Sequence, residues 1–585
     1  RLGIRATLSD DIRILEEGFV RNKESFLGFS ERARKIRDNT FKDDAELLGE
    51  FEHFVKAIEN VVVGRKLYPL QLLSAYHMAF AQNSCNFSVP GAGKTTIVYA
   101  AYAYLKLVED VNKHVDKILI IGPTAAFGPW EDEYKECFGR EPSIVKISEQ
   151  SHDVRERHFY SKESSEITVI GYQLLDRYQQ DIKYFLRHNR VMLVVDEAHY
   201  VKSVNGVWSG ALLSFSNDAV ARVALTGTPA PNGYEDLYNL YRFILPLNYE
   251  QVLGMNYKRL RDLAGDKKHP ERVEDFSKRV SPFFVRIKKK DLKLPRVINH
   301  EPIKVKMSPT QRKIYDFIEG EYIRGFQNSS VGNLKQKLSQ ARIIRLRQAA
   351  TNPALLSRPL DDYYLDSGYT DGLGINDEDI LHRIKCYEKN EIPPKFIALL
   401  ELARRILSKD GEKVIIWSQF IYNSKQIRKM LVDDGIPSEL LIGEVEKASR
   451  REVIKKFNNP EDMSFRVVIA HPKAVGESIS LHKGCHNAIY LDMDYNAASY
   501  IQSRDRIHRV LNPLPSGTVT NYYRIVSEDS IDGVITEKVN EKVEVMEKLI
   551  NEDIPLFVSN GLNDESDDVN IVKALIDDYS RRNSK

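Results

Sequence analysis

The sequence contains little cysteine and no long apolar run. Its four cysteines lie far apart in 585 residues and form no C-x-x-C pair; they are Cys85, Cys137, Cys386 and Cys485. This spacing argues against a disulfide framework and a structural zinc site, and it fits a reducing cytoplasm. No apolar run approaches the ~18 residues that a membrane helix needs, so we expect no membrane partner.

The N-terminus lacks both an initiator Met and the apolar core of a signal peptide. We therefore expect a fragment of a longer protein, whose missing part leaves room for another domain. Hydrophobic residues make up 42% and charged residues 29%, which is typical of a soluble globular protein. The net charge of +2 argues neither for nor against a nucleic-acid partner.

Local charge is more informative than net charge. Residues 284–296 carry six basic side chains against one acidic, whereas residues 549–572 carry six acidic side chains and no basic ones. Basic runs usually form a solvated surface. The alternative is contact with a phosphate backbone, for which Lys288, Lys289 and Lys290 are the candidates.

The pattern of apolar residues divides the chain into five segments. Length alone predicts roughly four folded units. Residues 1–66 have helical spacing, residues 67–235 and 391–545 alternate buried-strand runs with helices, residues 236–390 are helical and charged, and residues 546–585 form a C-terminal helix and polar tail. Continuous apolar strands are typical of parallel sheets with helices on both faces, so we predict an α/β fold used twice.

The first motif that carries chemistry is a glycine turn between a short apolar run and a helix. It consists of Pro90, Gly91, Ala92, Gly93, Lys94, Thr95 and Thr96. Its glycines let backbone N–H groups turn toward phosphates, and the helix N-terminus adds positive charge. Lys94 would contact the β and γ phosphates, and Thr95 would offer a hydroxyl to Mg²⁺. The first glycine of the usual phosphate loop is replaced by Ser88, and the alternative is a chance glycine turn.

The second motif is a pair of acids, Asp196 and Glu197, after the apolar run 191–195. The carboxyl ends of buried parallel strands are where α/β sheets bind ligands. Mg²⁺ explains two adjacent acids there: Asp196 would hold the metal, and Glu197 would orient and deprotonate the attacking water. The alternative is a helix N-cap. With the glycine turn, this pair predicts ATP and Mg²⁺ as cofactors.

Three weaker signals accompany these motifs. Thr226 and Thr228 end the next predicted strand, where their hydroxyls could sense a phosphate beside the acids; a plain β-turn is the alternative. Gln71 could read both edges of adenine, although an isolated Gln is most often a surface residue. Arg506 and Arg509 are three residues apart on a predicted helix, where they would share a face and bind phosphate, unless that helix is only a solvated surface.

Taken in order from about Leu67 to about Val526, these residues resemble the Swi/Snf-type ATPases of helicase superfamily two. The landmarks are Leu67 to Gln71, Asp196 to His199, Leu225 to Pro229, Asp236 to Leu240, Pro295, Leu346 to Gln348 with Asn352 and Pro353, Ile415 to Phe420, Asn496, and Asp505 to Arg509. The resemblance implies further site residues. These are Gly476 for the nucleotide, His199 and Gln502 for coupling, and Arg347, Ser418 and Gln419 for nucleic acid.

The sequence departs from the family pattern at three places. Ser88 and Val89 replace the acidic pair before the phosphate loop, serines thin the glycine-rich run at 475–481, and Leu511 and Asn512 replace the Gly-Gln that closes the arginine motif. These differences indicate a divergent member. They concern coupling to DNA more than ATP hydrolysis.

The resemblance implies two RecA-like lobes, 67–235 and 391–545, with helical insertions between them. It also implies ATP-driven translocation on double-stranded DNA, bound through its phosphate backbone, with other subunits or domains of a larger DNA-processing system as further partners. We expect a cytoplasmic protein of a prokaryote or a viral host, in DNA repair or anti-phage defence. The alternatives are a strand-separating helicase or restriction-type motor subunit, and a scaffold with a relic ATP site.

Overall fold

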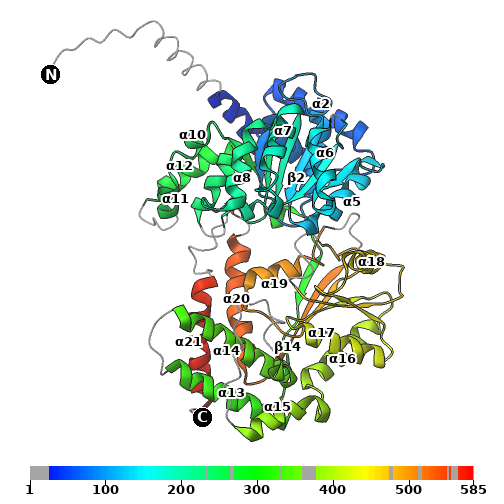
Figure 1. Cartoon of the computed structure of the whole chain (residues 1–585), viewed down its shortest axis with the longest axis vertical. Coiled ribbons are helices and arrows are strands. Elements are labelled where there is room, and N and C mark those ends of the chain that lie inside the picture. Colours follow the sequence, from blue (N-terminus) through cyan, green and yellow to red (C-terminus); the bar gives the residue numbers. More distant parts are fainter. Residues whose placement is uncertain are drawn as a thin grey trace, which may run out of the picture. The chain divides into compact units, whose positions relative to one another are not determined.

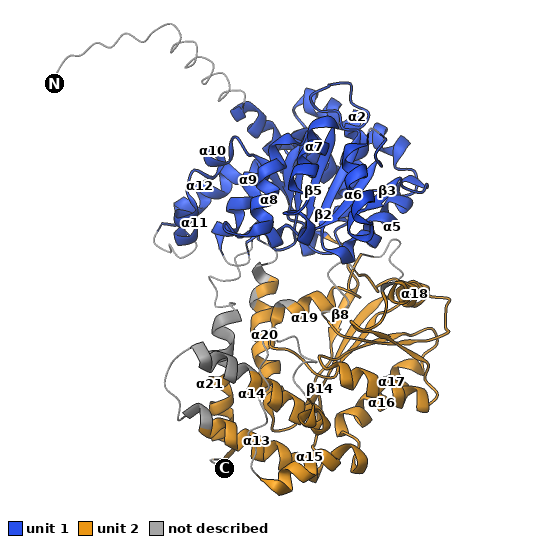
Figure 2. Ribbon diagram, viewed as in Figure 1, with its two compact units in different colours: residues 1–291, 552–559 blue, residues 292–551, 560–585 orange. Residues whose placement is uncertain are grey.

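The computed structural model describes residues 26–583, except 162, 231–232, 264–268, 328–332, 359–376, 473–478, 511–516, 550–551 and 555–563. The chain divides into two compact units (Figure 2). The first consists of residues up to 291 together with 552–559, and the second consists of residues 292–551 together with 560 onward.

A parallel sheet of seven strands forms the centre of the first unit, in the order β3-β4-β2-β5-β6-β1-β7. The strands are β1 Asn83–Asn86, β2 Lys117–Gly122, β3 Ile144–Lys146, β4 Ile167–Gly171, β5 Val191–Asp196, β6 Ala221–Leu225 and β7 Phe284–Val285. Along β2, Ile118 and Ile120 face one side and Leu119 and Ile121 the other, and all four are at most 1% exposed. Both faces of the sheet are therefore covered, as the apolar runs predicted.

Helices follow most strands of the first unit (Figure 1). They are α2 Ala45–Val61, α3 Pro69–Ala81, α4 Lys94–Leu105, α5 Phe127–Phe138, α6 His152–Tyr160, α7 Gln179–His188, α8 Val207–Phe215, α9 Leu237–Ile244, α10 Tyr249–Leu253, α11 Tyr257–Leu263 and α12 Pro270–Val280. A helical stretch over residues 26–37 precedes α2, so the predicted N-terminal helical extension is confirmed from residue 26. Pro69 begins α3, where its fixed φ suits the first turn.

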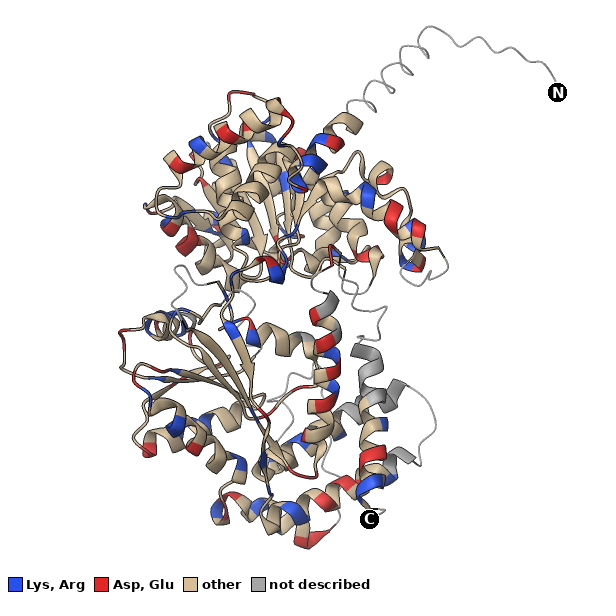
Figure 3. Cartoon of the chain, turned by 180° about the vertical axis from the view of Figure 1, so that it is seen from behind, with Lys and Arg blue, Asp and Glu red and all other residues tan. Residues whose placement is uncertain are grey.

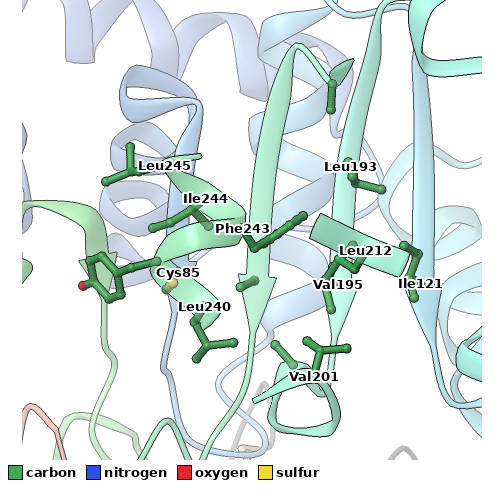
Figure 4. Close-up of a cluster of buried hydrophobic side chains, with 14 of the residues drawn as sticks. Cys85, Ile121, Leu193, Val195, Val201, Leu212, Leu240, Phe243, Ile244 and Leu245 are labelled. Atoms are coloured by element: carbon green, nitrogen blue, oxygen red, sulfur yellow. The ribbon is translucent and has the colours of Figure 1, made fainter. Parts of the chain in front are cut away.

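The core of the first unit lies between one face of its sheet and the helices α6 to α12. Figure 4 shows Ile121 of β2, Leu193 and Val195 of β5, and Leu240 and Ile244 of α9 in this cluster. The buried residues Val191 to Val195 of β5 lead directly to its carboxyl end. That end carries the two acids predicted to act on ATP.

The second unit is built on another parallel sheet of seven strands, with the path β11-β12-β10-β13-β14-β8 and β9 paired to β14. The strands are β8 Arg296–Asn299, β9 Ile303–Val305, β10 Val414–Trp417, β11 Ser438–Leu441, β12 Val467–Ala470, β13 Asn487–Tyr490 and β14 Val519–Ser527. The segment 236–390 thus supplies β7, β8 and β9 in addition to its helices. Two α/β lobes with parallel sheets, the predicted fold class, are confirmed.

The helices of the second unit come from both sides of its strands in the sequence. They are α13 Pro309–Gln327, α14 Asn333–Thr351, α15 Glu378–Asn390, α16 Pro394–Leu407, α17 Ile421–Asp433, α18 Lys447–Asn458, α19 Ala497–Arg504, α20 Ile531–Leu549 and α21 Asp564–Asn583. Phe396, Leu399, Ala403 and Ile406 form a helical stripe that buries α16 against β10 and its neighbours.

The C-terminal helix α21 packs on α20 and α14, and an ion pair joins it to a buried acid of α13. Glu319 of α13 is 1% exposed, and Arg582 of α21 lies 2.6 Å from its carboxylate. The hydroxyl of Tyr315 donates to the same carboxylate at 3.0 Å. An unpaired carboxylate would be costly at this depth, so Arg582 fixes the helix to the unit.

Between α20 and α21 the chain returns to the first unit. Asp553 forms ion pairs with Arg37 at 2.6 Å and with Lys288 at 2.7 Å, and Ile554 joins the core of the first unit. The two units are therefore connected at 291–292 and again on both sides of the segment 552–559.

Charged residues of both signs alternate along the helices, and the strands are mostly uncharged (Figure 3). Within the part of the chain that the structure describes, none of the helices combines the length and apolar character needed to cross a bilayer.

Candidate active site

The glycine turn lies between β1 and α4 in the first unit. Gly91 and Gly93 have φ values of +83° and +80°, a left-handed conformation that glycine adopts without steric cost. A Cβ on Gly93 would lie 2.3 Å from Nε2 of Gln71, so this position also needs the space. Lys94 is the first residue of α4, and its Nζ donates to the carbonyl of Ser88 at 3.1 Å. The turn and the helix N-terminus together have the geometry of a phosphate cradle, and phosphate binding there stays a prediction.

The two threonines after Lys94 have different surroundings. Thr95 is half-buried in the first turn of α4. The hydroxyl of Thr96, a residue that is 1% exposed, donates to the carboxylate of Glu133 on α5. A contribution of Thr96 to ATP binding, which stays a prediction, would therefore come through its backbone N–H.

Gln71 supports the glycine turn from α3. Its Nε2 donates to the carbonyl of Ala92 at 3.0 Å, and its Oε1 accepts from the backbone N–H of Tyr68 at 3.0 Å. The side chain is 5% exposed. The structure thus gives Gln71 a role in holding the turn, and adenine recognition remains a prediction.

The two acids lie at the carboxyl end of β5. Glu197 has φ +53° and ψ +52°, a left-handed conformation that costs a non-glycine residue about 1–2 kcal/mol. The carboxylate of Asp196 accepts the N–H of Glu197 on Oδ1 at 3.0 Å and the indole N–H of Trp130 on Oδ2 at 2.9 Å. Gly122, at the end of β2, comes close enough that a Cβ there would lie 3.2 Å from Cβ of Asp196.

Burial and the neighbouring negative charge of Glu197 raise the pKa of Asp196 above its ordinary value. The Trp130 N–H and the positive charge of Lys94 oppose this rise. Nδ1 of His199 lies 3.4 Å from the carboxylate of Glu197. A cation beside the two acids would relieve their repulsion.

These residues fit MgATP. Mg²⁺ is usually held by one or two carboxylates together with substrate phosphates and water, and here Asp196 and the hydroxyl of Thr95 would provide the protein ligands. Among the described residues there is no cluster of three His, Cys, Asp or Glu that could hold a metal without such help.

The turn after β6 packs against the glycine turn. The N–H of Thr228 donates to Oγ1 of Thr226 at 3.1 Å, and a Cβ on Gly227 would lie 3.1 Å from Cδ of Pro90. The N–H of Thr226 also donates to the carbonyl of Asn86, at the end of β1, at 3.1 Å. A change at the phosphate site can therefore reach this turn directly, and its coupling role stays a prediction.

In the second unit, Arg506 and Arg509 converge on one acceptor. Nη1 of Arg506 lies 3.1 Å from the carbonyl oxygen of Ile479, and Nη2 of Arg509 lies 3.3 Å from it. The predicted helix for these arginines is wrong, because α19 ends at Arg504. There the chain tightens into turns, in which the N–H of Arg506 bonds back to Ser503 at 3.3 Å.

Burial and the positive charge of Arg506 lower the pKa of Arg509 to about 9. Nε of Arg509 also donates to the carbonyl of Asp505 at 2.8 Å. The forked geometry of two neighbouring guanidinium groups also suits a phosphate. Gln502 lies half-buried on α19. Gly476, Leu511 and Asn512 lie outside the described residues.

Two family models match the chain. The SNF2-related domain matches residues 87–355, which include the glycine turn and both acids, and the helicase conserved C-terminal domain matches residues 394–511, which include both arginines. The chain belongs to the Swi/Snf family. It is a divergent member of these superfamily-two ATPases, because the relatives reported below are 24–26% identical to it.

Three Swi/Snf relatives illustrate how far the sequence has diverged. They are an uncharacterized ATP-dependent helicase of Mycoplasma genitalium (26% identity, 80% of this chain, 40% of the relative), a SWI/SNF-related chromatin regulator homologue of Caenorhabditis elegans (26%, 79%, 49%), and the ATP-dependent helicase FUN30 of Saccharomyces cerevisiae (24%, 79%, 44%). The chain thus spans less than half the length of these relatives. A solved Sulfolobus solfataricus SWI2/SNF2 ATPase core in complex with dsDNA is 22% identical, over 86% of this chain and 97% of that one, with a TM-score of 0.37.

Three residues predicted from the Swi/Snf resemblance to contact nucleic acid are buried. Arg347 is 1% exposed, and its Nη1 lies 3.5 Å from Asp494. The hydroxyl of Ser418 and the backbone N–H of Gln419 both donate to the carboxylate of Asp492, at 2.8 and 2.7 Å. Arg347 and Ser418 thus have almost no exposed surface, and all three residues brace the carboxyl edge of the second sheet. Their contact with nucleic acid stays a prediction.

The three lysines of the basic stretch differ in exposure. The Lys288 side chain is 24% exposed and pairs with Asp553, whereas Lys290 is exposed and Lys289 half-buried in the short 3₁₀ helix Lys289–Asp291. Of the three, Lys290 therefore offers the most surface to a phosphate backbone.

Two residues at the acid pair were not predicted from the sequence. Trp130 of α5 bonds to the Asp196 carboxylate, and the hydroxyl of Tyr172, directly after β4, donates to the carbonyls of Asp196 at 2.5 Å and of Glu197 at 3.3 Å. The available signal was position, because Tyr172 follows a strand whose carboxyl end lies at the same sheet edge as the acids.

Proposed function

We propose that the chain is a DNA-dependent ATPase that moves along double-stranded DNA and remodels DNA–protein complexes. The observation that supports this most is the first unit's arrangement of a phosphate cradle, Gly91 to Lys94, beside Asp196 and Glu197. Membership of the Swi/Snf family adds the expectation of duplex DNA as the track. The sequence divergence favours a setting in DNA repair or anti-phage defence.

In this proposal the first unit binds and hydrolyses ATP. Lys94 contacts the β and γ phosphates, Thr95 and Asp196 hold the metal, and Glu197 orients the attacking water and accepts its proton. Mg²⁺, when bound, neutralises charge that develops on the phosphates. The left-handed backbone at Glu197 turns its side chain out of the strand direction and beside His199.

The second unit supplies Arg506 and Arg509 to the transition state. In related nucleotide hydrolases an arginine of this kind accelerates hydrolysis by ~10³–10⁵. Their convergence on the Ile479 carbonyl supports the assignment, because it places two guanidinium groups close enough together to act on one phosphate.

Duplex DNA is bound mainly through its phosphates, and Lys290, which is exposed, is the first candidate contact of the basic stretch. Such contacts carry no sequence information, so binding should weaken steeply with salt and depend little on sequence.

The test of the proposed function is Glu197→Gln. ATP should still bind, while hydrolysis stimulated by duplex DNA falls by orders of magnitude, because the amide cannot accept the proton. Turnover is measured with duplex, single-stranded and junction DNA. Glu166→Gln, which changes a carboxylate paired with Lys106 in the same unit, is the matched control.

Unchanged turnover in Glu197→Gln would refute the catalytic assignment. Displacement of a third strand without separation of the duplex is expected for a translocase. Strand separation would favour the helicase alternative instead.

A further inference from the structure

We propose that Trp130 and Tyr172 are positioning residues that hold the two acids of the hydrolytic site in working geometry. This inference rests on the proposed function, since it concerns the same acids. It adds two side chains that would touch neither ATP nor DNA. Trp130 holds a carboxylate, and Tyr172 holds the backbone of the turn that follows it.

Trp130 connects Asp196 to the helix that begins at Lys94. Its indole N–H donates to Oδ2 of Asp196 at 2.9 Å, and its own carbonyl accepts from the hydroxyl of Tyr99, on α4, at 2.8 Å. The rings of Tyr99 and Trp130 pack edge to face, with centroids 5.3 Å apart and planes at 84°. Trp130 is 1% exposed. The metal acid is thus linked through α5 to the phosphate helix.

A second contact reinforces the link between α4 and α5. The hydroxyl of Thr96 donates to Glu133, one turn of α5 beyond Trp130. Because α4 is held to α5 at two points, a displacement of the phosphate helix would also displace the indole.

The two N–H donors on Asp196 fix the plane of its carboxylate. Oδ1 accepts from Glu197 and Oδ2 from Trp130, so rotation of the carboxylate would break both bonds. Each oxygen keeps a further lone pair for a cation or its water. Removing a hydrogen bond to a metal-binding carboxylate typically lowers metal affinity or activity by ~10–100-fold.

Tyr172 acts on the backbone. Its hydroxyl carries one hydrogen, which faces the carbonyls of both Asp196 and Glu197. Glu197 is the residue in the left-handed conformation, and such a backbone persists only when its surroundings hold it. The ring is held by Tyr200 and Trp208, with centroids at 5.4 and 5.7 Å.

Packing alone would give a different result. If the two aromatic residues only filled the core, removing a polar atom from either should matter no more than the same change elsewhere. Two matched controls exist. Trp417 is a fully buried tryptophan of the second unit, and Tyr241 donates its hydroxyl to the carbonyl of Val280 at 2.8 Å, deep in the first unit.

The experiment compares Trp130→Phe and Tyr172→Phe with Trp417→Phe and Tyr241→Phe. Binding of a fluorescent adenine nucleotide is titrated with Mg²⁺, and kcat and KM for ATP are measured separately. Trp130→Phe should raise the Mg²⁺ concentration for half-maximal binding by ~10-fold or more. Tyr172→Phe should lower kcat by ~10-fold or more with little change in KM. Both controls should leave these quantities near wild type.

Equal Mg²⁺ dependence in Trp130→Phe and Trp417→Phe, together with equal kcat in Tyr172→Phe and Tyr241→Phe, would overturn the inference. If Trp130→Phe does not fold, Tyr172→Phe decides alone, because it removes one oxygen and keeps the ring. Failure of the proposed function is a separate result: Glu197→Gln would then hydrolyse ATP at the wild-type rate, whatever Mg²⁺ dependence the aromatic variants show.

Discussion

At the scale of single residues, the phosphate cradle depends on the absence of a side chain at Gly93. Its φ of +80° disfavours any side chain, and the amide of Gln71 occupies the place where a Cβ would project. The same amide holds Ala92 from the other side. Gly93 therefore needs both a left-handed backbone and space beside Gln71. A variant of a second glycine that has only the backbone requirement can separate these two effects.

Gly93→Ala should abolish tight ATP binding while Gly411→Ala leaves it unchanged. Gly411 has φ +75° with nothing within 4 Å of its Cβ position, so the control carries the same backbone strain, roughly 1 kcal/mol, without the collision. Binding is measured with a fluorescent adenine nucleotide, and folding by thermal unfolding. Equal binding by the two variants would show that the contact with Gln71 does not matter.

Site residues that belong to a recognisable motif could be predicted from the sequence. Lys94 and Asp196 stand in motifs that require those side chains, and the structure places both within the first unit. Trp130 was missed because its contact with Asp196 joins residues 66 apart in the chain, which spacing does not reveal. Arg347 was assigned to nucleic acid from the Swi/Snf resemblance, and its 1% exposure could not be predicted, because a motif carries no record of burial.

At the scale of elements, long apolar strands were predictable and short polar ones were not. The runs that became β2, β4 and β5 are buried on both faces, so their composition predicts them. β1 reads Asn-Ser-Cys-Asn and β8 has exposed ends. These two are strands because neighbouring strands offer hydrogen bonds, a cause that lies outside their own residues.

The turn after α19 gives an element-scale prediction. Arg509→Ala should slow hydrolysis by ~10³-fold or more with ATP binding little changed, because its charge is needed only as the phosphate transfers. Arg504→Ala is the control from the same run: that guanidinium lies 4.6 Å from the ring centroid of Tyr522 and pairs with Glu547 at 3.3 Å. It should reduce stability and leave turnover near wild type. Weakened ATP binding with normal turnover in Arg509→Ala would refute the assignment.

At the scale of the whole molecule, the C-terminal helix is part of the second unit's fold. Burial raises the pKa of Glu319 above its ordinary value even with Arg582 beside it. An acid whose pKa is raised on folding binds more protons in the folded state, so the stability it contributes falls as pH rises through that range. The positive charge of Arg582 lowers the pKa of Glu319 and so reduces this loss of stability.

Arg582→Ala should therefore destabilise the protein by about 3–5 kcal/mol near neutral pH, and by less at roughly pH 5, where Glu319 is more readily protonated. Arg581→Ala is the control, because its side chain is 74% exposed and surface pairs contribute about 0–1 kcal/mol. Urea unfolding at both pH values measures the difference. A loss that does not depend on pH would contradict the role given to Glu319.

The return of residues 552–554 to the first unit has a consequence for modularity. Asp553 neutralises Arg37 and Lys288, and Ile554 completes the first unit's core, yet both are encoded after nearly all of the second unit. A gene fragment that stops at the 291–292 junction would yield a lobe in which Arg37 and Lys288 both lose Asp553, Arg37 keeps its pair with Asp38, and the apolar site of Ile554 is uncovered. The first unit therefore cannot be transferred to another protein as residues up to 291 alone. A chimeric protein that contains it must also include residues 552–554.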